Sequence, residues 1–332
     1  MNKIYLYPKV YPTENPYIAN LEKSLSPYYR VVNASNNRSG VFDLFRYLFD
    51  ADIYFFNWIE NIPSRKFGKI QVMVFVFFLF IAKCLRKKII WTLHNKYSHE
   101  KVDCKWTDFM YRTMFRHSDF ILTHSQAGID FAAGKYPKDV KKMRYFIHPL
   151  SKLYPEPATG VPVYDFFIWG TIWPYKGIIE FLKFINGAGV KIKILIAGIC
   201  VNEQVKKDML PLITEDIVHV EKFLDFDEIA DLAGKSKFTL FTYSTNSVLS
   251  SGSLMDSIAM GSVVIGPDAG AFRDLSKYGF VKTYNRYEDI IDILNKQQES
   301  HYSGRADIES FWQENNWERF GEKFSATLSD II

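Results

Sequence analysis

Short apolar runs alternate with amphipathic helical stretches along nearly the whole chain, a pattern typical of parallel β-sheets covered by helices. In the first half, strands are predicted at residues 3–7, 29–32, 53–56, 88–93, 120–123 and 143–147, with helices at 17–25, 41–49, 67–85, 105–115 and 126–133. In the second half, strands are predicted at 164–169, 191–197, 217–220, 238–242 and 262–265, with helices at 177–185, 202–212, 227–234, 253–260 and 287–297. Residues 308–332 also favour a helix.

A proline-rich segment separates the two halves. Residues 149–162 contain four prolines and one glycine, which argues against regular structure there. We therefore expect two α/β domains of similar size, residues 1–150 and 163–311, joined by a linker at 151–162 and forming a cleft. Ligands of such sheets bind at the carboxyl ends of the strands. Functional residues are thus expected directly after strands.

The segment 243–270 carries the most informative chemical pattern. It predicts a turn of small residues, a helix that begins at Ser251, Gly252 and Ser253, and a buried strand. The free backbone N–H groups and the positive dipole end of such a helix attract phosphate. Asp256, in about the first turn, is placed to bind a hydroxyl-bearing part of the same ligand. This combination indicates a nucleotide-sugar.

A histidine follows one of the strands in the first half. His94 and Asn95 come directly after the predicted strand 88–93, at its carboxyl end. A lone histidine is more often structural, but one over a cleft can donate to, or accept from, a sugar hydroxyl. His99 is a second contact or a solvated loop residue.

A lysine occupies the corresponding place in the second half. Lys176 stands at a strand-to-helix junction after Gly170 and Thr171, where its ammonium group can counter a diphosphate. The alternative is a solvent-facing lysine at a helix start, which the positive helix dipole disfavours unless an anion binds. Phe223 and Leu224 follow the strand 217–220, where backbone groups can contact a nucleotide base.

Composition adds few constraints. The 332 residues, 48% hydrophobic and 23% charged with a net charge of +4, indicate an ordinary globular protein of about two domains without a nucleic-acid partner. Cys84, Cys104 and Cys200 are too widely spaced for a zinc site or a disulfide scaffold, and the N-terminus predicts a strand rather than a signal peptide, so we expect a cytoplasmic location. GxGxxG, GxxxxGK[ST] and HExxH motifs are absent, which argues against dinucleotide oxidoreductases, P-loop enzymes and a metal site. Asp225 and Asp227 have DxD spacing but fit a helix cap better.

One stretch of the first half has two interpretations. Residues 72–82 are an uninterrupted apolar run of 11, shorter than the roughly 18 needed to span a bilayer, with basic residues on both sides. The run is either a helix buried between the sheet and its neighbours, or part of a surface at 65–88 that docks on the anionic inner face of a membrane, where a lipid-linked acceptor would lie.

Five segments, taken in order, resemble glycosyltransferases of the GT-B fold, in particular the family-4-like bacterial sugar transferases. They are Ala51–Trp58, Trp91-Thr-Leu-His-Asn95, Ser118–Ser125, Gly170–Gly177 and Leu254-Met-Asp-Ser-Ile-Ala-Met-Gly-Ser-Val-Val-Ile265. The resemblance covers nearly the whole chain. It implies two facing Rossmann-like domains, with the acceptor held by the first and the donor by the second, and a C-terminal helix of about 312–332 that crosses back to the first.

The resemblance also implies a role for each candidate. His94 matches a position that contacts the donor sugar near its transferred carbon, and Lys176 matches the lysine that binds the donor diphosphate. Residues 251–253 match the backbone amides that hold the same phosphates. Asp256 falls where the second glutamate of the Glu-x7-Glu motif binds ribose, and residues 267–270 match the loop after the next strand.

Two departures from the family pattern bear on the mechanism. The first glutamate of Glu-x7-Glu falls at Val248, and the arginine expected before Lys176 is replaced by Thr171 and Trp173. Retention and inversion of the anomeric configuration therefore both stay open, and an inverting enzyme needs a general base on the acceptor side. The acceptor-side candidates are Glu14, Asn15, Asn95 and His99, and the candidate bases are Glu14, Glu60 and Glu100.

These features predict a metal-independent hexosyltransferase of bacterial polysaccharide or glycoconjugate synthesis. Its donor is a nucleotide-diphosphate sugar, its acceptor a saccharide or a lipid-linked saccharide, and it needs no cofactor besides this co-substrate. Two alternatives stay open: a nucleotide-sugar epimerase of the same fold, and a catalytically degenerate partner subunit that binds nucleotide-sugar. The missing carboxylate at Val248 supports the second.

Overall fold

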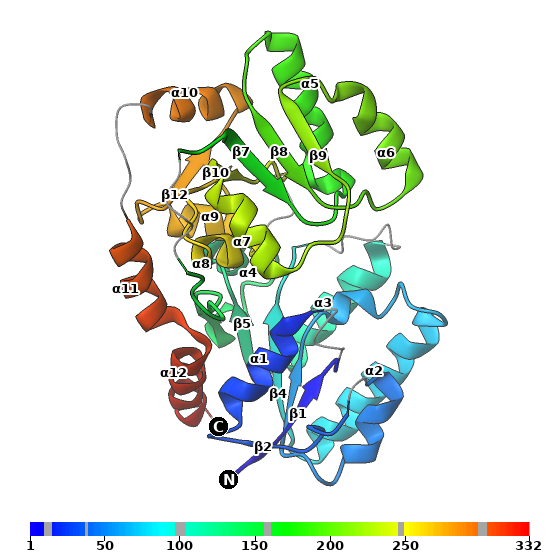
Figure 1. Ribbon diagram of the computed structural model, residues 1–332. Helices are drawn as coiled ribbons and strands as arrows, with labels where there is room; N and C mark the ends of the chain where they lie inside the picture. The colour runs from blue at the N-terminus through cyan, green and yellow to red at the C-terminus, as the bar shows by residue number, and fades with distance from the viewer. Residues whose placement is uncertain are drawn as a thin grey trace. The chain divides into compact units, whose positions relative to one another are not determined.

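The computed structural model describes residues 1–9, 15–36, 39–96, 104–155, 161–244, 249–297 and 304–331. The chain divides into two compact units (Figure 1). Unit 1 comprises residues 1–149 and 315–332, and unit 2 comprises residues 150–314. Each unit is built on a six-stranded parallel sheet covered by helices, which confirms the predicted α/β class of two Rossmann-like domains.

The sheet of unit 1 has the strand order β2-β1-β3-β4-β5-β6. Its strands are β1 (Lys3–Tyr7), β2 (Arg30–Val31), β3 (Ile53–Phe56), β4 (Lys88–Leu93), β5 (Phe120–Thr123) and β6 (Met143–Tyr145). Its helices are α1 (Pro16–Leu25), α2 (Gly68–Cys84), α3 (Cys104–His117), α4 (Gln126–Lys135) and α12 (Trp317–Ser329), with 3-10 turns η1 (Val41–Tyr47), η2 (Ile59–Asn61) and η3 (Val140–Lys142). Because all paired strands are parallel, their carboxyl ends lie along one edge.

Alternate residues of the strands divide the core of unit 1 between the two faces of the sheet. Leu6 and Phe55 belong to the face that packs against α1 and α12. Tyr54, Phe56 and Trp91 point to the opposite face, where their rings contact phenylalanines of α2 and α3. Both faces are buried, so these strands are continuous apolar runs, and this is why their positions could be predicted.

Helix α12 completes unit 1 although it comes last in the sequence. It lies beside α1, red against blue in Figure 1. The two backbones approach so closely at Gly321 that a Cβ atom there would lie 2.1 Å from the Ser24 carbonyl oxygen. The Phe324 ring stacks on Phe55 with a centroid distance of 5.3 Å. The C-terminal helix is thus part of the core of unit 1.

The sheet of unit 2 has the order β12-β11-β10-β7-β8-β9. Its strands are β7 (Tyr164–Trp169), β8 (Ile194–Ala197), β9 (Ile217–Val220), β10 (Ser236–Leu240), β11 (Val264–Pro267) and β12 (Val281–Tyr284). Its helices are α5 (Ile178–Ala188), α6 (Glu203–Met209), α7 (Phe226–Gly234), α8 (Gly252–Ala259), α9 (Gly270–Leu275), α10 (Tyr287–Gln297) and α11 (Arg305–Asn315), with 3-10 turns η4 (Pro174–Lys176) and η5 (Leu210–Leu212). Asp225 caps α7 in a reciprocal capping box with Glu228, as predicted.

The segment expected to link the domains is partly attached to unit 2. Tyr154 is buried, its N–H donates to Ala259 O (3.0 Å), and its carbonyl accepts from the Arg305 guanidinium (2.8 Å). Residues 156–160 lie outside the described part of the chain.

The structure corrects several predicted elements. Residues 41–47 form a 3-10 turn rather than an α-helix. The predicted C-terminal helix is two helices, because the side chain of Asn316 accepts a hydrogen bond from Arg319 N and starts α12 anew. Strand β12 and helix α9 were not predicted, and Gly270, expected in a loop, begins α9. In the described part of the chain, no helix is long and apolar enough to cross a membrane.

Candidate functional site

Polar side chains follow three neighbouring strands at the carboxyl edge of unit 1. Asn57 comes after β3, His94 after β4 and His124 after β5, and all three are buried. Tyr17 of α1 packs edge-on against both histidines, with ring-centroid distances of 4.9 Å to His94 and 5.7 Å to His124. The topology therefore gathers residues distant in sequence around one point of the sheet edge.

His94 is held in a single orientation. Its Nε2 donates to Asn57 Oδ1 (2.9 Å), while Asn57 Nδ2 donates to Tyr7 O (3.3 Å), which fixes the end of the amide that faces the ring. Trp58 stacks on the imidazole at 4.5 Å. The backbone of Trp58 is left-handed (φ 46°, ψ 41°), a strained conformation for a bulky residue and one that is typical of functional sites.

The protonation state of His94 follows from this packing. Burial lowers its pKa well below the ordinary 6.5, and the nearby His124 and His148 lower it further. The ring is therefore neutral near pH 7, with its proton on Nε2 and a lone pair on Nδ1. This Nδ1 can accept a hydrogen bond from a hydroxyl. Such a residue is suited to hold a sugar rather than to donate a proton.

His124 and His148 are also kept neutral. His124 Nδ1 donates to Phe146 O (2.9 Å), so its Nε2 accepts from the Tyr17 hydroxyl (2.8 Å). Burial lowers the pKa of His124 to about 3 and that of His148 to about 4. These histidines serve as fixed hydrogen-bonding and packing groups at pH 7, not as cations.

A buried carboxyl group lies beside this cluster. Glu60 follows Trp58 in η2, and its Oε1 accepts from Asn95 Nδ2 (2.9 Å). Its Oε2 is buried and has no hydrogen-bond partner among the described residues, and burial raises the pKa of Glu60 to about 7. The Tyr111 hydroxyl donates to Asn95 O (2.8 Å). Asn95, next to His94, is thus anchored by both its side chain and its backbone.

The acceptor-side candidates have different outcomes. Asn95 belongs to the His94 cluster, whereas Asn15 caps α1 by accepting from Tyr17 N (2.9 Å). Glu14, His99 and Glu100 lie outside the described residues. Sequence reasoning gave no role to Asn57, Trp58 or Tyr17. The first two directly follow a predicted strand, so the criterion that singled out His94 could have found them.

In unit 2, Lys176 is buried at the carboxyl edge between β7 and β10. Its Nζ lies 3.5 Å from Trp169 O, and its carbonyl accepts from Thr242 Oγ1 (2.5 Å). Burial lowers its pKa to about 8. The interpretation as a solvent-facing lysine is therefore wrong. Gly170 (φ +84°) leaves room for the ammonium group, since a Cβ there would lie 3.2 Å from Nζ.

The start of α8 lies at the same edge, because α8 follows β10. The Ser251 side chain caps α8 by accepting from Leu254 N (3.3 Å). Burial raises the pKa of Tyr243 above its ordinary value, whereas the side chains of Ser251 and Ser253 lower it. Among the described residues, none accepts from the backbone N–H of Gly252 or Ser253. These two amides are available for an anion.

The chain links this helix start to the lysine. The ring of Tyr175, next to Lys176, lies 6.1 Å from that of Tyr243, and Ser244 N donates to Tyr175 O (3.2 Å). Trp169 Nε1, at the end of β7, donates to Ser257 Oγ of α8 (2.9 Å). The contacts thus place Gly170, Lys176 and residues 251–253 at one edge of the sheet of unit 2.

Asp256 is the carboxylate of this edge. It lies in the second turn of α8, not the first, and is partly buried next to Ser257. Burial raises its pKa to about 7. A carboxyl group with so little water around it is expected to gain from hydroxyl donors such as those of a ribose.

Three other donor-site candidates are less closely tied to this cluster. Phe223 and Leu224 follow β9, which is separated from β7 by β8, and the Phe223 ring is 81% exposed. Thr171 lies next to Gly170 and is partly buried. Across the described ranges, no group of three or more His, Cys, Asp or Glu side chains is arranged to hold a metal ion.

The chain is similar in structure, but not in sequence, to known proteins. No protein-family profile and no curated protein sequence matches the chain. Solved structures do match: Anabaena HepE in complex with UDP-glucose (TM-score 0.71, 12% identity, 99% of this chain and 100% of that chain) and the apo lipopolysaccharide outer core galactosyltransferase WaaB (0.69, 13%, 100% of each). AviGT4, a glycosyltransferase involved in avilamycin A biosynthesis, also matches (0.61, 13%, 98% and 97%). The chain has the GT-B fold.

At 12–13% identity these structural matches establish the fold of the chain but not the roles of its residues. The predicted resemblance to GT-B glycosyltransferases is confirmed. Val248, the position of the first glutamate of Glu-x7-Glu, lies outside the described residues. The departure at this position therefore stays a statement about the sequence.

Proposed function

We propose that this GT-B protein is a glycosyltransferase that moves a hexosyl group from a nucleotide-diphosphate sugar to a saccharide or lipid-linked acceptor. Unit 2 binds the donor and unit 1 the acceptor. The observation that carries the proposal is the buried Lys176 beside the free amides at the start of α8. HepE, which shares the fold, has been solved with UDP-glucose, and this supports the same donor class here.

The chemistry of this edge is leaving-group stabilisation. Among the described residues, no carboxylate pairs with Lys176, so an ammonium group is buried with only the Trp169 carbonyl nearby. Such a group is stabilised when an anion binds, and two amides at a helix start provide further donors. Charge that develops on the departing nucleotide diphosphate would be neutralised by these groups, without a metal ion or other cofactor.

The other residues then have defined tasks. Asp256 holds the ribose hydroxyls of the nucleotide. His94, neutral and oriented by Asn57, accepts a hydrogen bond from a hydroxyl of the sugar. Loss of this contact misplaces the reacting carbon, which reduces the rate even when the nucleotide stays bound.

The acceptor and the location are further parts of the proposal. The enzyme works in the cytoplasm, in polysaccharide or glycoconjugate synthesis, with peripheral membrane contact through residues 65–88. This contact would bring it to lipid-linked acceptors.

The test begins with calorimetric titration of UDP-, GDP-, ADP- and CMP-sugars. One of them should bind the wild type, and Lys176→Met should weaken that binding by about 100-fold, as expected for a lost charge-assisted contact. Lys183→Met is the matched control, because Lys183 is an exposed lysine of α5. An equal loss in both variants, or none in Lys176→Met, would contradict the assignment.

Product analysis separates transfer from the other two activities. Transfer requires an acceptor, whereas an epimerase converts the donor alone and a degenerate binding subunit releases no nucleotide. His94→Ala should retain nucleotide binding and lose transfer while its melting temperature changes little. A variant that fails to fold would indicate that His94 is structural, and His94→Gln, which keeps the volume and a hydrogen-bonding group, would then test the contact.

A further inference from the structure

Helix α2 is apolar on all sides, yet it lies at the surface of unit 1. Its buried side chains are Val72, Phe75, Phe78, Leu79 and Ala82. The opposite side of the helix carries large apolar residues that are 50–69% exposed, namely Ile70, Met73, Phe77 and Phe80, with Phe67 just before the helix. A surface helix ordinarily presents polar residues on its outer side. The prediction that α2 is buried between the sheet and its neighbours is therefore correct for one side of the helix and wrong for the other.

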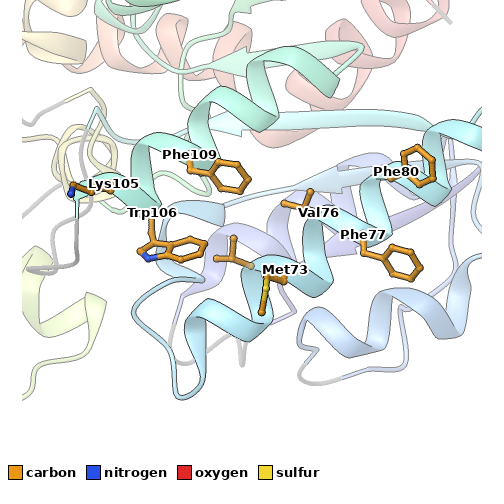
Figure 2. Close-up of a pocket in the computed structure, with 8 residues that line it drawn as sticks. Met73, Val76, Phe77, Phe80, Lys105, Trp106 and Phe109 are labelled. Atoms are coloured by element: carbon orange, nitrogen blue, oxygen red, sulfur yellow. The ribbon is translucent and has the colours of Figure 1, made fainter.

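The exposed residues of α2 form one stripe. Ile70, Met73, Phe77 and Phe80 follow one another at intervals of three and four residues, which places them on one side of the helix. The stripe continues onto α3, where Trp106 and Phe109 face α2 across a groove of about 850 Å³ (Figure 2). We call this surface, made of Phe67, the stripe, Trp106 and Phe109, the apolar face. A contiguous exposed surface of this kind indicates a binding partner.

The surroundings of the apolar face are basic. Between Glu60 and Glu100 the sequence contains no Asp or Glu. Lys66 and Lys69 are exposed at the start of α2, and Arg86 is exposed just after its end. None of the three forms an ion pair with a described residue. The face is thus bordered at both ends by cations that pair with no carboxylate among the described residues.

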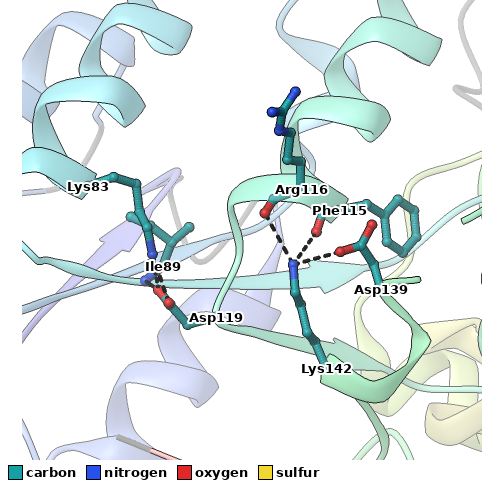
Figure 3. Close-up of polar contacts among 7 residues, drawn as sticks. All are labelled: Lys83, Ile89, Phe115, Arg116, Asp119, Asp139 and Lys142. Carbon is teal, nitrogen blue, oxygen red and sulfur yellow. Dashed lines mark hydrogen bonds and ion pairs between the residues drawn. The ribbon is translucent and has the colours of Figure 1, made fainter. Parts of the chain in front are cut away.

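Other cations nearby are engaged in the structure. Lys83 pairs with Asp119 (2.7 Å), which also accepts from Ile89 N (2.8 Å), while Lys142 binds Asp139 and the last carbonyls of α3 (Figure 3). These contacts fix the C-terminal ends of α2 and α3 against the sheet. Lys66, Lys69 and Arg86 form no such ion pair with any residue that the structure describes, and their charges can meet an external anion.

Exposed apolar side chains bordered by cations indicate what kind of partner the apolar face binds. We propose that the apolar face docks unit 1 on an anionic bilayer, with α2 lying in the membrane interface and its flanking cations on lipid headgroups. Apolar side chains that enter the acyl boundary and cations that meet anionic lipids are the two contributions to interfacial binding. A symmetric pairing of two copies would instead bring the same cations together, which is unfavourable.

The orientation has a consequence for the acceptor. Helix α2 starts, and the described part of α3 begins, at the carboxyl edge of the sheet, the edge that carries His94 and Glu60. Docking therefore brings this edge near the headgroup layer. Resting on the proposed function, the inference is that the acceptor is lipid-linked rather than a free saccharide.

Vesicle co-sedimentation tests the docking without any enzymatic step. The wild type should bind vesicles containing phosphatidylglycerol and bind pure phosphatidylcholine much more weakly. The triple variant Met73→Ser, Phe77→Ser, Phe80→Ser should lose about 100-fold in partitioning, about fivefold for each side chain. Lys66→Gln, Lys69→Gln, Arg86→Gln should lose about 100-fold on anionic vesicles alone, about fivefold for each cation.

The controls exclude trivial explanations. Leu210→Ser and Val161→Ser remove exposed apolar residues of unit 2 and should leave vesicle binding unchanged. The triple-serine variant alters exposed positions only, so its far-ultraviolet spectrum and its nucleotide-sugar affinity should match the wild type. Equal binding of wild type and triple-serine variant to anionic vesicles would overturn the proposal. So would self-association that the triple-serine variant abolishes, since a second copy would then cover the face.

A second assay addresses the acceptor. Label from a radioactive nucleotide-sugar should enter the organic phase of a bacterial polar-lipid extract, and the triple-serine variant should reduce this transfer while donor affinity stays the same. Label found only in water-soluble saccharide would overturn the lipid-linked acceptor. If no nucleotide-sugar binds but vesicle binding follows the predicted pattern, the proposed function fails and the docking stands.

Discussion

Replacing Glu60 by glutamine should stabilise unit 1 increasingly as the pH rises from 4.5 to 7. Burial raises the pKa of this carboxyl group from 4.5 to about 7. Between these values the folded protein holds a proton that the unfolded chain has lost, so stability falls as the pH rises, by about 1.4 kcal/mol per pH unit. Below 4.5 both states are protonated and the effect vanishes. Above 7 it reaches its full size of about 3 kcal/mol.

The glutamine variant isolates this contribution. Its side-chain oxygen can still accept from Asn95, and its amide nitrogen takes the place of Oε2, which has no partner either. Any penalty for burying that amide is the same at every pH and drops out of the pH dependence. The lowered pKa values of His94, His124 and His148 give an opposite slope, but they are common to both proteins and cancel in the difference.

The assay compares urea unfolding of the two proteins at pH 4.5, 6, 7 and 8. Hydrogen-exchange labelling of peptides from β3 and β4 reports unit 1 separately from unit 2. The difference in unfolding free energy between variant and wild type should grow by about 3 kcal/mol across this range and stay level above pH 7. Glu318→Gln, at an exposed position of α12, is the control. If the difference in unfolding free energy between Glu60→Gln and wild type did not change with pH, the pKa of Glu60 would be the same in the folded and unfolded states. That result would refute the reasoning.

Three further predictions concern unit 2. Gly170→Ala should cost about 1–2 kcal/mol in unfolding free energy, because alanine is strained at φ +84°. It should also weaken calorimetric binding of the nucleotide-sugar that the wild type binds, by displacing the Lys176 ammonium group; unchanged values for both would contradict this geometry. Asp256→Asn should weaken binding of the nucleoside diphosphate of the wild-type donor about tenfold, but binding of its 2′-deoxy form much less, since the lost contact is to ribose hydroxyls. Competition titrations measure this, and an equal loss for both would place Asp256 elsewhere. Because burial lowers the pKa of Lys176 to about 8, its positive charge is lost as the pH rises above 8, so pyrophosphate affinity should fall between pH 7.5 and 9.5 in the wild type and stay flat in Lys176→Met.

Most of the sheet positions could be predicted because both faces of each sheet are buried. Strands such as Ile53–Phe56 and Ile194–Ala197 are then runs of consecutive apolar residues, which are easily recognised. Strand β12 (Val281–Tyr284) lies at the edge of its sheet, and its middle residues are only partly buried, so its sequence lacks this pattern. The break between α11 and α12 depends on a single capping asparagine within a sequence that otherwise favours one long helix.

The candidate site could be predicted only in part, for a similar reason. His94 and Lys176 were found because each follows a strand, a property of the local sequence. Their environments depend on distant residues: Asn57 orients His94 from another strand, and Tyr17 reaches the cluster from α1. The two sides of α2 could not be distinguished either, since residues 72–82 are apolar on both and only the tertiary packing decides which side is buried.

The return of the last helix to unit 1 affects the order in which the chain can fold during synthesis. Domains generally fold as they leave the ribosome, starting with the N-terminal one. Here unit 2 is continuous from 150 to 314, whereas Phe55 and Phe120 gain their contact with the Phe324 ring only after all of unit 2 has been translated. The second domain in the sequence can therefore be the first to finish. Until α12 has left the ribosome, unit 1 exposes a strip of aromatic core to chaperones and to other nascent chains.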